Sequence, residues 1–74
     1  MVNELSLPHK RLGRRIRELR LERGVTQEDL AYKIGISLTH MGYLERGQRN
    51  LNIDKVFRIA KALKVKPGDL FKGL

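Results

Sequence analysis

A short stretch in the middle of the sequence combines side chains that could recognise a ligand. The residues SLTHMGYLERGQRN, at positions 37–50, bring hydroxyl, imidazole, amide and guanidinium groups together. If they form a helix of about 100° per residue, Met41 and Leu44 lie on its inner side. Thr39, Gly42, Tyr43 and Arg46 then lie on the outer side, with Leu38 and His40 flanking them. Such a face can hydrogen-bond to base edges and phosphates when a helix enters the major groove of DNA.

The titratable residues form no pattern typical of catalysis or metal binding. The sequence has no cysteine, which excludes disulfides and thiolate metal sites. His9 and His40 are far apart, and Glu28 and Asp29 are adjacent residues suited to a helix N-terminus. There is no nucleophile with a matching base and no glycine-rich phosphate loop. We therefore expect no enzyme, no metal, no cofactor and no evident small-molecule ligand.

The charge is strongly positive and unevenly distributed. Sixteen Lys and Arg against eight Asp and Glu give a net charge of +8, which favours a polyanionic partner such as nucleic acid over a merely solubilising charge. Residues 10–23 hold seven basic and two acidic side chains, whereas residues 26–50 are balanced at three of each. The first segment should therefore supply long-range attraction, much of it as a solvated face. Arg11, Arg14 and Arg15 are its candidates for flanking phosphates.

No sequence feature indicates a membrane protein or a secreted one. Apolar runs are far shorter than the roughly 20 residues that a membrane-spanning helix needs. The N-terminus has no apolar core of the kind found in secretory signals. We expect action in the cytoplasm, associated with the nucleoid.

The hydrophobic spacing and the capping residues predict an all-α domain of five helices. Residues 1–8 are interpreted as a loose lead-in to a domain at 9–74. Helices are expected at 9–23, 26–34, 38–46, 53–64 and from 67 to about 71. Thr26, Ser37 and Asn52 suit helix N-caps, and Gly24 and Gly35 suit the residue that follows a helix.

The break at Gly35 is the most informative local feature. Two short helices share one core through Leu30, Ile34, Ile36, Met41 and Leu44, with the small Ala31 where they would touch. A glycine turn between such helices favours a crossing of roughly 90–120°, the geometry of a helix-turn-helix. The first helix can then brace the second against the domain while the second stays exposed.

The segments TQEDLAYKIGISLTHMGYLERGQRN, RIAKALKVKPGDLF and LGRRIRELRLERG together resemble the Cro/repressor-type helix-turn-helix family, also called the xenobiotic-response-element type. The resemblance covers about residues 11–72, with the motif at 26–45, and implies a compact lambda-repressor-like fold. It implies a homodimeric regulator of transcription that binds a palindromic operator in double-stranded DNA. The size and LERGQRNLNI also resemble small restriction–modification controller proteins.

The resemblance assigns roles to individual residues. Leu38, Thr39, His40 and Tyr43 match the base-reading positions, and Arg20 and Glu45 match an internal ion pair. Gln27 matches a phosphate contact that can also brace the recognition helix. The full set expected to bind DNA is Gln27, Ser37, Leu38, Thr39, His40, Tyr43, Arg46, Arg49 and Asn50.

Several residues keep two interpretations on sequence alone. Leu38 could contact a thymine methyl group or join the core, and His40 could contact DNA or bond locally. Gly42 costs a helix roughly 1 kcal/mol relative to alanine. It could allow a close approach to a phosphate or base, or it could be a tolerated surface glycine. Lys66 stands where a Ser-type cap is usual before Pro67, so the last helix is less well specified.

The C-terminal part contains more large apolar residues than one small core needs. We assign Leu70 to the core and Phe57, Phe71 and Leu74 to a homodimer interface. A two-fold dimer would place its recognition helices about 34 Å apart, one turn of DNA.

Two other binding functions remain as alternatives. An antitoxin or another protein-interaction module could bind DNA secondarily, but such proteins usually carry a partner-wrapping segment, which we do not expect here. RNA binding is disfavoured because four aromatic residues offer few stacking faces.

Overall fold

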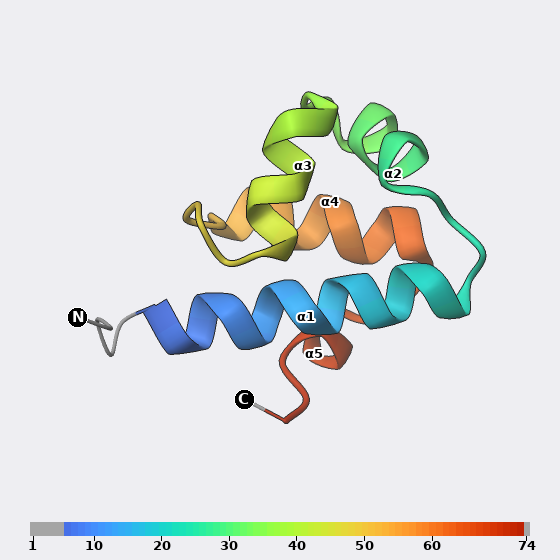
Figure 1. The fold of residues 1–74 in the computed structure, drawn as a ribbon. Coiled ribbons are helices and arrows are strands. Elements are labelled where there is room, and N and C mark those ends of the chain that lie inside the picture. Colours follow the sequence, from blue (N-terminus) through green and yellow to red (C-terminus); the bar gives the residue numbers. More distant parts are fainter. Residues whose placement is uncertain (1–5, 74) are drawn as a thin grey trace.

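The computed structural model describes residues 6–73 of the 74-residue chain. It contains α1 (Ser6–Glu22), α2 (Gln27–Ile34), α3 (Leu38–Glu45), α4 (Ile53–Leu63) and α5 (Pro67–Leu70), with no strand in this range (Figure 1). The predicted all-α fold of five helices is confirmed. Most of the expected lead-in, residues 1–5, and the proposed interface residue Leu74 lie outside the described residues.

Helix α1 begins at Ser6, three residues earlier than predicted. Pro8 therefore lies inside the first turn rather than before the helix. A proline is tolerated there because the first backbone N–H groups of a helix have no intrahelical acceptor.

The other helix boundaries follow the predicted capping residues. Thr26, Ser37 and Asn52 each accept a hydrogen bond from the backbone N–H three residues later, at 2.8–3.0 Å. Gly35 ends α2 in the left-handed conformation with φ of 77°, which the absence of a Cβ makes accessible. These local signals fix where α2 stops and α3 starts, and thereby the turn between them.

One hydrophobic core joins all five helices. Figure 1 shows α3 standing across α1, with α2 beside it, α4 behind it and α5 on the other side of α1. The largest fully buried side chains are Ile16, Leu30, Met41, Ile59, Leu63 and Leu70. Burial of a side chain of this kind contributes about 1.5–3 kcal/mol, so these residues hold α3 against the remaining helices.

Two glycines bring the end of α3 close to α1. A Cβ on Gly13 would lie 2.5 Å from the backbone oxygen of Leu44, and a Cβ on Gly47 would lie 2.6 Å from the Cα of Lys10. Both distances are shorter than any ordinary contact. Glycine is thus required sterically at both sites for α3 to rest on α1.

Helix α5 is short and braces α1 from the opposite side. The Asp69 carboxylate accepts a hydrogen bond from the Lys66 N–H at 3.0 Å, which is the N3-to-N-cap bond of a capping box at the start of α5. This bond, together with the nearby Lys72, lowers the pKa of Asp69 from its ordinary value of 3.8. The Asp69 carbonyl accepts from Arg15 Nε at 2.9 Å, so α5 is tied to α1.

Candidate nucleic-acid interface

The outer surface of α3 carries the residues that the sequence assigned to base reading. Leu38 and Thr39 are exposed, His40 and Tyr43 are half-buried, and Met41 and Leu44 are buried against the core. The N–H of His40 donates to the Ser37 hydroxyl at 3.0 Å, so Ser37 acts as the N-cap of α3. The hydroxyl can still donate its own proton to an external acceptor.

Gly42 lies on the outer side of α3, as predicted, but it is not exposed. It is buried, because the Arg46 side chain folds back over it, and a Cβ there would lie 3.1 Å from a terminal guanidinium nitrogen. The glycine therefore makes room for Arg46. The Arg46 guanidinium covers this part of the outer side of α3.

Two guanidinium groups lie close to the Tyr43 ring. The Cζ atoms of Arg46 and Arg49 each lie 5.2 Å from the centre of its ring, within the range of cation–π attraction. Arg46 Nε also donates to Gln48 Oε1 at 2.9 Å. The two arginines are therefore partly ordered beside Tyr43, and positive charge sits at the C-terminal end of α3. Gln48 was not expected to contribute to this arrangement.

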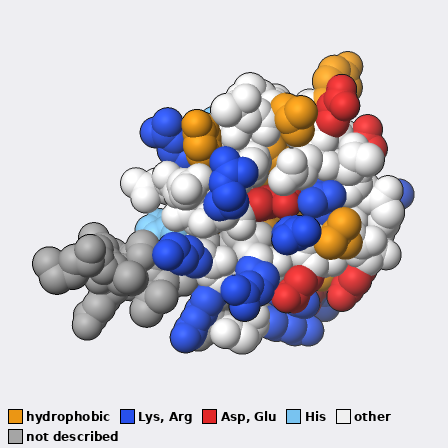
Figure 2. Space-filling model, viewed as in Figure 1, with side chains coloured by type: hydrophobic (Ala, Val, Ile, Leu, Met, Phe, Trp, Pro, Cys, Tyr) orange, Lys and Arg blue, Asp and Glu red, His pale blue; other side chains and the backbone are white. Residues whose placement is uncertain are grey.

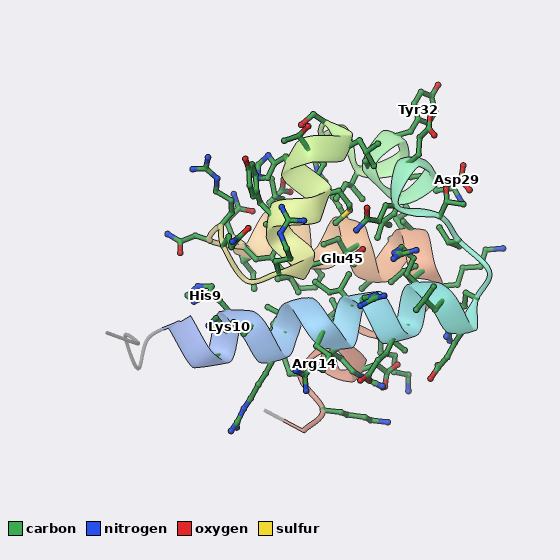
Figure 3. The ribbon with its side chains drawn as sticks, in the orientation of Figure 1. His9, Lys10, Arg14, Asp29, Tyr32 and Glu45 are labelled. Carbon is green, nitrogen blue, oxygen red and sulfur yellow. The ribbon has the colours of Figure 1, made fainter. Side chains whose placement is uncertain are left out.

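A buried polar network fixes the orientation of α3. Arg20 and Glu45 are 6% and 7% exposed and form a two-pronged ion pair, with Nε–Oε2 at 2.8 Å and Nη2–Oε1 at 3.0 Å. Gln27 Nε2 donates to Glu45 Oε1 at 3.1 Å. Figure 3 shows Glu45 between α3 and α1. The structure confirms the predicted Arg20–Glu45 pair and the bracing contact of Gln27.

A groove adjoins this network on the surface. It runs between the end of α1, the start of α2 and the end of α3, and Arg17, Gln27 and Arg46 contribute to its walls. The second amide hydrogen of Gln27 remains available for an external acceptor, since one Nε2–H bond goes to Glu45. An anion in the groove would meet this amide and the two guanidinium groups.

Positive charge surrounds the groove and follows α1. Figure 2 shows Lys and Arg side chains gathered over α1 and beside α3, with an acidic spot between them. Lys10 and Arg14 project from the first half of α1, and Arg11, Arg14 and Arg17 are exposed (Figure 3). Arg15 differs from the expectation, because it is half-buried and bonded to the Asp69 carbonyl. It has a structural contact rather than a free guanidinium.

The residues expected at a dimer interface are exposed where the structure describes them. Phe57 is 55% and Phe71 is 43% exposed, while Leu70 is fully buried in the core as predicted. Ile53, one turn before Phe57 on α4, is 67% exposed and was missed. Its i, i+4 spacing from Phe57 in the sequence was the signal that could have found it.

Other classes of site were also sought in residues 6–73. No group of three or more His, Asp or Glu side chains in this range could hold a metal ion. No helix in the same range is both long enough and apolar enough to span a membrane.

Comparisons with known proteins match both the fold and the motif. The Helix-turn-helix family model matches residues 16–70. Control protein C.BamHI of Bacillus amyloliquefaciens is 39% identical over 59 residues, covering 78% of this chain and 73% of that protein.

Solved structures give the same result. The restriction-modification controller protein C.AhdI from Aeromonas hydrophila is 40% identical with a TM-score of 0.80, over 84% of this chain and 94% of that one. The clp gene regulator ClgR from C. glutamicum is 28% identical with a TM-score of 0.85, over 88% and 83% of the two chains. The chain therefore belongs to the helix-turn-helix family of DNA-binding transcriptional regulators.

Proposed function

We propose that the protein is a sequence-specific regulator that binds a palindromic operator as a homodimer and places α3 in the major groove. The observation that carries this proposal is the exposed, nearly uncharged outer surface of α3, held in place by the buried Arg20–Glu45–Gln27 network. A rigid helix is needed because base-edge hydrogen bonds tolerate little misplacement.

Base reading is assigned to Thr39, Tyr43 and His40, with Leu38 at the start of the helix. The hydroxyls of Thr39 and Tyr43 and the imidazole of His40 can each exchange hydrogen bonds with base edges. Phosphate contacts are assigned to Gln27, Ser37, Arg46, Arg49 and Asn50, none of which belongs to the eight residues of α3. Tyr43 could instead donate to a phosphate through its hydroxyl.

A dimer is supported by the apolar surface of α4 and α5. Ile53, Phe57 and Phe71 are large side chains that the core leaves exposed, and burying them against a second copy would remove this surface from water. A two-fold axis there would present two α3 helices to successive major grooves, about 34 Å apart. Leu74 is proposed for the same interface.

The similarity to control proteins of restriction–modification systems suggests which class of regulator this protein is. C.BamHI and C.AhdI are 39% and 40% identical to this chain over aligned segments that cover 78% and 84% of it. We assign this protein to the same class of controller, acting in the cytoplasm on DNA of the nucleoid. An antitoxin that binds DNA secondarily is the competing function.

Selection of a randomised duplex library at moderate salt tests the proposal. We expect a palindromic consensus with half-sites about one turn apart, bound by two protein chains per duplex. Phe57→Asp should give a monomer in sedimentation and weaken operator binding at least tenfold, roughly the effect of losing one of two coupled half-sites. Salt-sensitive binding without a consensus, together with copurification of a small basic protein, would instead favour the antitoxin function.

A further inference from the structure

An exposed leucine opens the recognition helix. Leu38 is the first residue of α3 and its side chain is 50% exposed, although leucine is among the residues most often buried. Ile36, two residues earlier, packs against the core, whereas Leu38 lies outside the core cluster. The interpretation of Leu38 as an additional core residue is therefore wrong for this structure, and about half of this residue is open to solvent.

The composition of α3 limits how this helix can read a base. Its sequence, LTHMGYLE, contains no Arg, Lys, Asn or Gln, the side chains that read guanine and adenine through bidentate hydrogen bonds. Thr39, His40 and Tyr43 can form hydrogen bonds, but Leu38 can only make an apolar contact. No Asp or Glu lies in the first turn, where a carboxylate would repel the DNA.

Only one kind of group on the major-groove edge of the base pairs is apolar and can pack against a leucine side chain. That group is the methyl on C5 of a pyrimidine, which thymine always carries and cytosine carries only when it is methylated. The first turns of a recognition helix are the part that approaches base edges most closely. Leu38 lies in this part.

We propose that Leu38 is a specificity residue that contacts the C5-methyl group of one pyrimidine in each operator half-site. This inference rests on the proposed function, because it requires α3 in the major groove. It goes further by naming the chemical group that the first position of the helix recognises. The contact excludes water from the methyl group and gains affinity by the hydrophobic effect.

Single-group changes in the DNA test the contact. Each thymine of the selected operator is replaced by uracil, symmetrically in both half-sites, which removes only the methyl group. At one position the wild-type protein should lose about fourfold in affinity per half-site, the value expected for one buried methyl-sized group. Leu38→Ala should bind the thymine operator more weakly and show no further loss with uracil at that position.

A matched variant controls for general effects of removing a leucine. Leu21→Ala also removes an exposed leucine, 57% exposed on α1 and outside α3. It should keep the full uracil effect. Equal urea midpoints for the wild type and both variants would show that all three proteins are folded.

The outcomes separate the two sources of the methyl group. A uracil effect that Leu38→Ala abolishes identifies thymine. If no uracil substitution matters, but methylation of one operator cytosine strengthens binding only when Leu38 is present, the group is that of 5-methylcytosine. Uracil and methylcytosine effects that are equal in the wild type and in Leu38→Ala would overturn the inference. If the wild-type protein shows no preference for any operator over random DNA, the proposed function itself is refuted.

Discussion

Helices α1 and α3 lie against each other but have opposite characters. The seventeen residues of α1 include six basic and two acidic side chains, whereas Glu45 is the one charged residue of α3 and is buried. The helix assigned to base reading is therefore almost neutral, and the positive charge stands beside it. Phosphate attraction acts over about 8–10 Å at moderate salt, so it need not come from the helix in the groove.

This difference separates two contributions to DNA binding. Charge on α1 should raise affinity for any duplex, since every duplex presents the same phosphates. The side chains of α3 should raise affinity for one sequence only. A buried ion pair, Arg20 of α1 with Glu45 of α3, fixes the position of the reading helix relative to the charged helix.

The largest expected effect comes from breaking this pair. Glu45→Ala leaves the buried Arg20 guanidinium uncompensated and should lower the free energy of unfolding by about 3–5 kcal/mol. Urea denaturation measures the loss. Glu18→Ala is the matched control. Its ion pair with Arg15 is longer, at 3.7 Å, and Glu18 is exposed, so the loss should cost under about 0.5 kcal/mol.

A second control checks the cause of that loss. Replacing both partners, Arg20→Met with Glu45→Leu, removes the unpaired charge and should recover a large part of the stability. An equally low urea midpoint in this double variant would show that packing, rather than the buried charge, is responsible.

The next effect in size concerns sequence reading. Thr39→Ala with Tyr43→Ala removes side chains from both half-sites and should lower the preference for operator over random DNA by about 100-fold or more. Binding to random DNA and the urea midpoint should change little. Titrating both duplexes at one salt concentration gives the ratio, and an unchanged ratio would refute the assignment of α3 as the reading surface.

Removing charge from α1 should have a smaller and uniform effect. Arg14→Ala with Arg17→Ala should weaken binding to operator and random DNA alike, by roughly tenfold. The slope of log affinity against log salt should become shallower by about 0.9 for each phosphate that the variant no longer neutralises. Lys61→Ala, exposed near the end of α4, is the control and should leave the slope unchanged. A selective loss of operator binding in the α1 variant would mean that these arginines read sequence.

The smallest effect concerns the support of α1 by α5. Because the pKa of Asp69 is lowered in the folded protein, the unfolded chain binds more protons below the ordinary value of 3.8. Its stabilising contribution is therefore present above pH 3.8 and is lost as the pH falls through the folded pKa. The urea midpoints of the wild type and Asp69→Asn should differ slightly at about pH 6 and converge as the pH falls below the folded pKa. A difference in urea midpoint that stays constant with pH would show that the charge of Asp69 does not stabilise the packing of α5 on α1.

Local chemistry made most of the fold predictable. Thr26, Ser37 and Asn52 are residues whose side chains satisfy free N–H groups, so they mark helix starts without reference to the rest of the chain. Gly35 marks a helix end equally locally, because a residue without a Cβ adopts the left-handed conformation easily. The start of α1 was misplaced because Pro8 is compatible both with a preceding loop and with a first turn.

The candidate site was less predictable where it depends on contacts between side chains. Periodicity placed Gly42 on the outer side of α3, but its burial depends on Arg46 folding back over it, which no spacing rule encodes. In the sequence Arg15 cannot be distinguished from its basic neighbours, because its hydrogen bond to the Asp69 carbonyl depends on where α5 packs. The close approach at Gly13 likewise depends on where α3 rests, so the glycine alone did not reveal it.

The division between α1 and α3 is tested most directly by one selection experiment with three proteins. The wild type, the Arg14→Ala/Arg17→Ala variant and the Thr39→Ala/Tyr43→Ala variant would each select from the same randomised duplex library. We predict the same palindromic consensus for the first two, recovered less efficiently by the α1 variant, and none for the α3 variant. A changed consensus with the α1 variant, or an unchanged one with the α3 variant, would contradict the account.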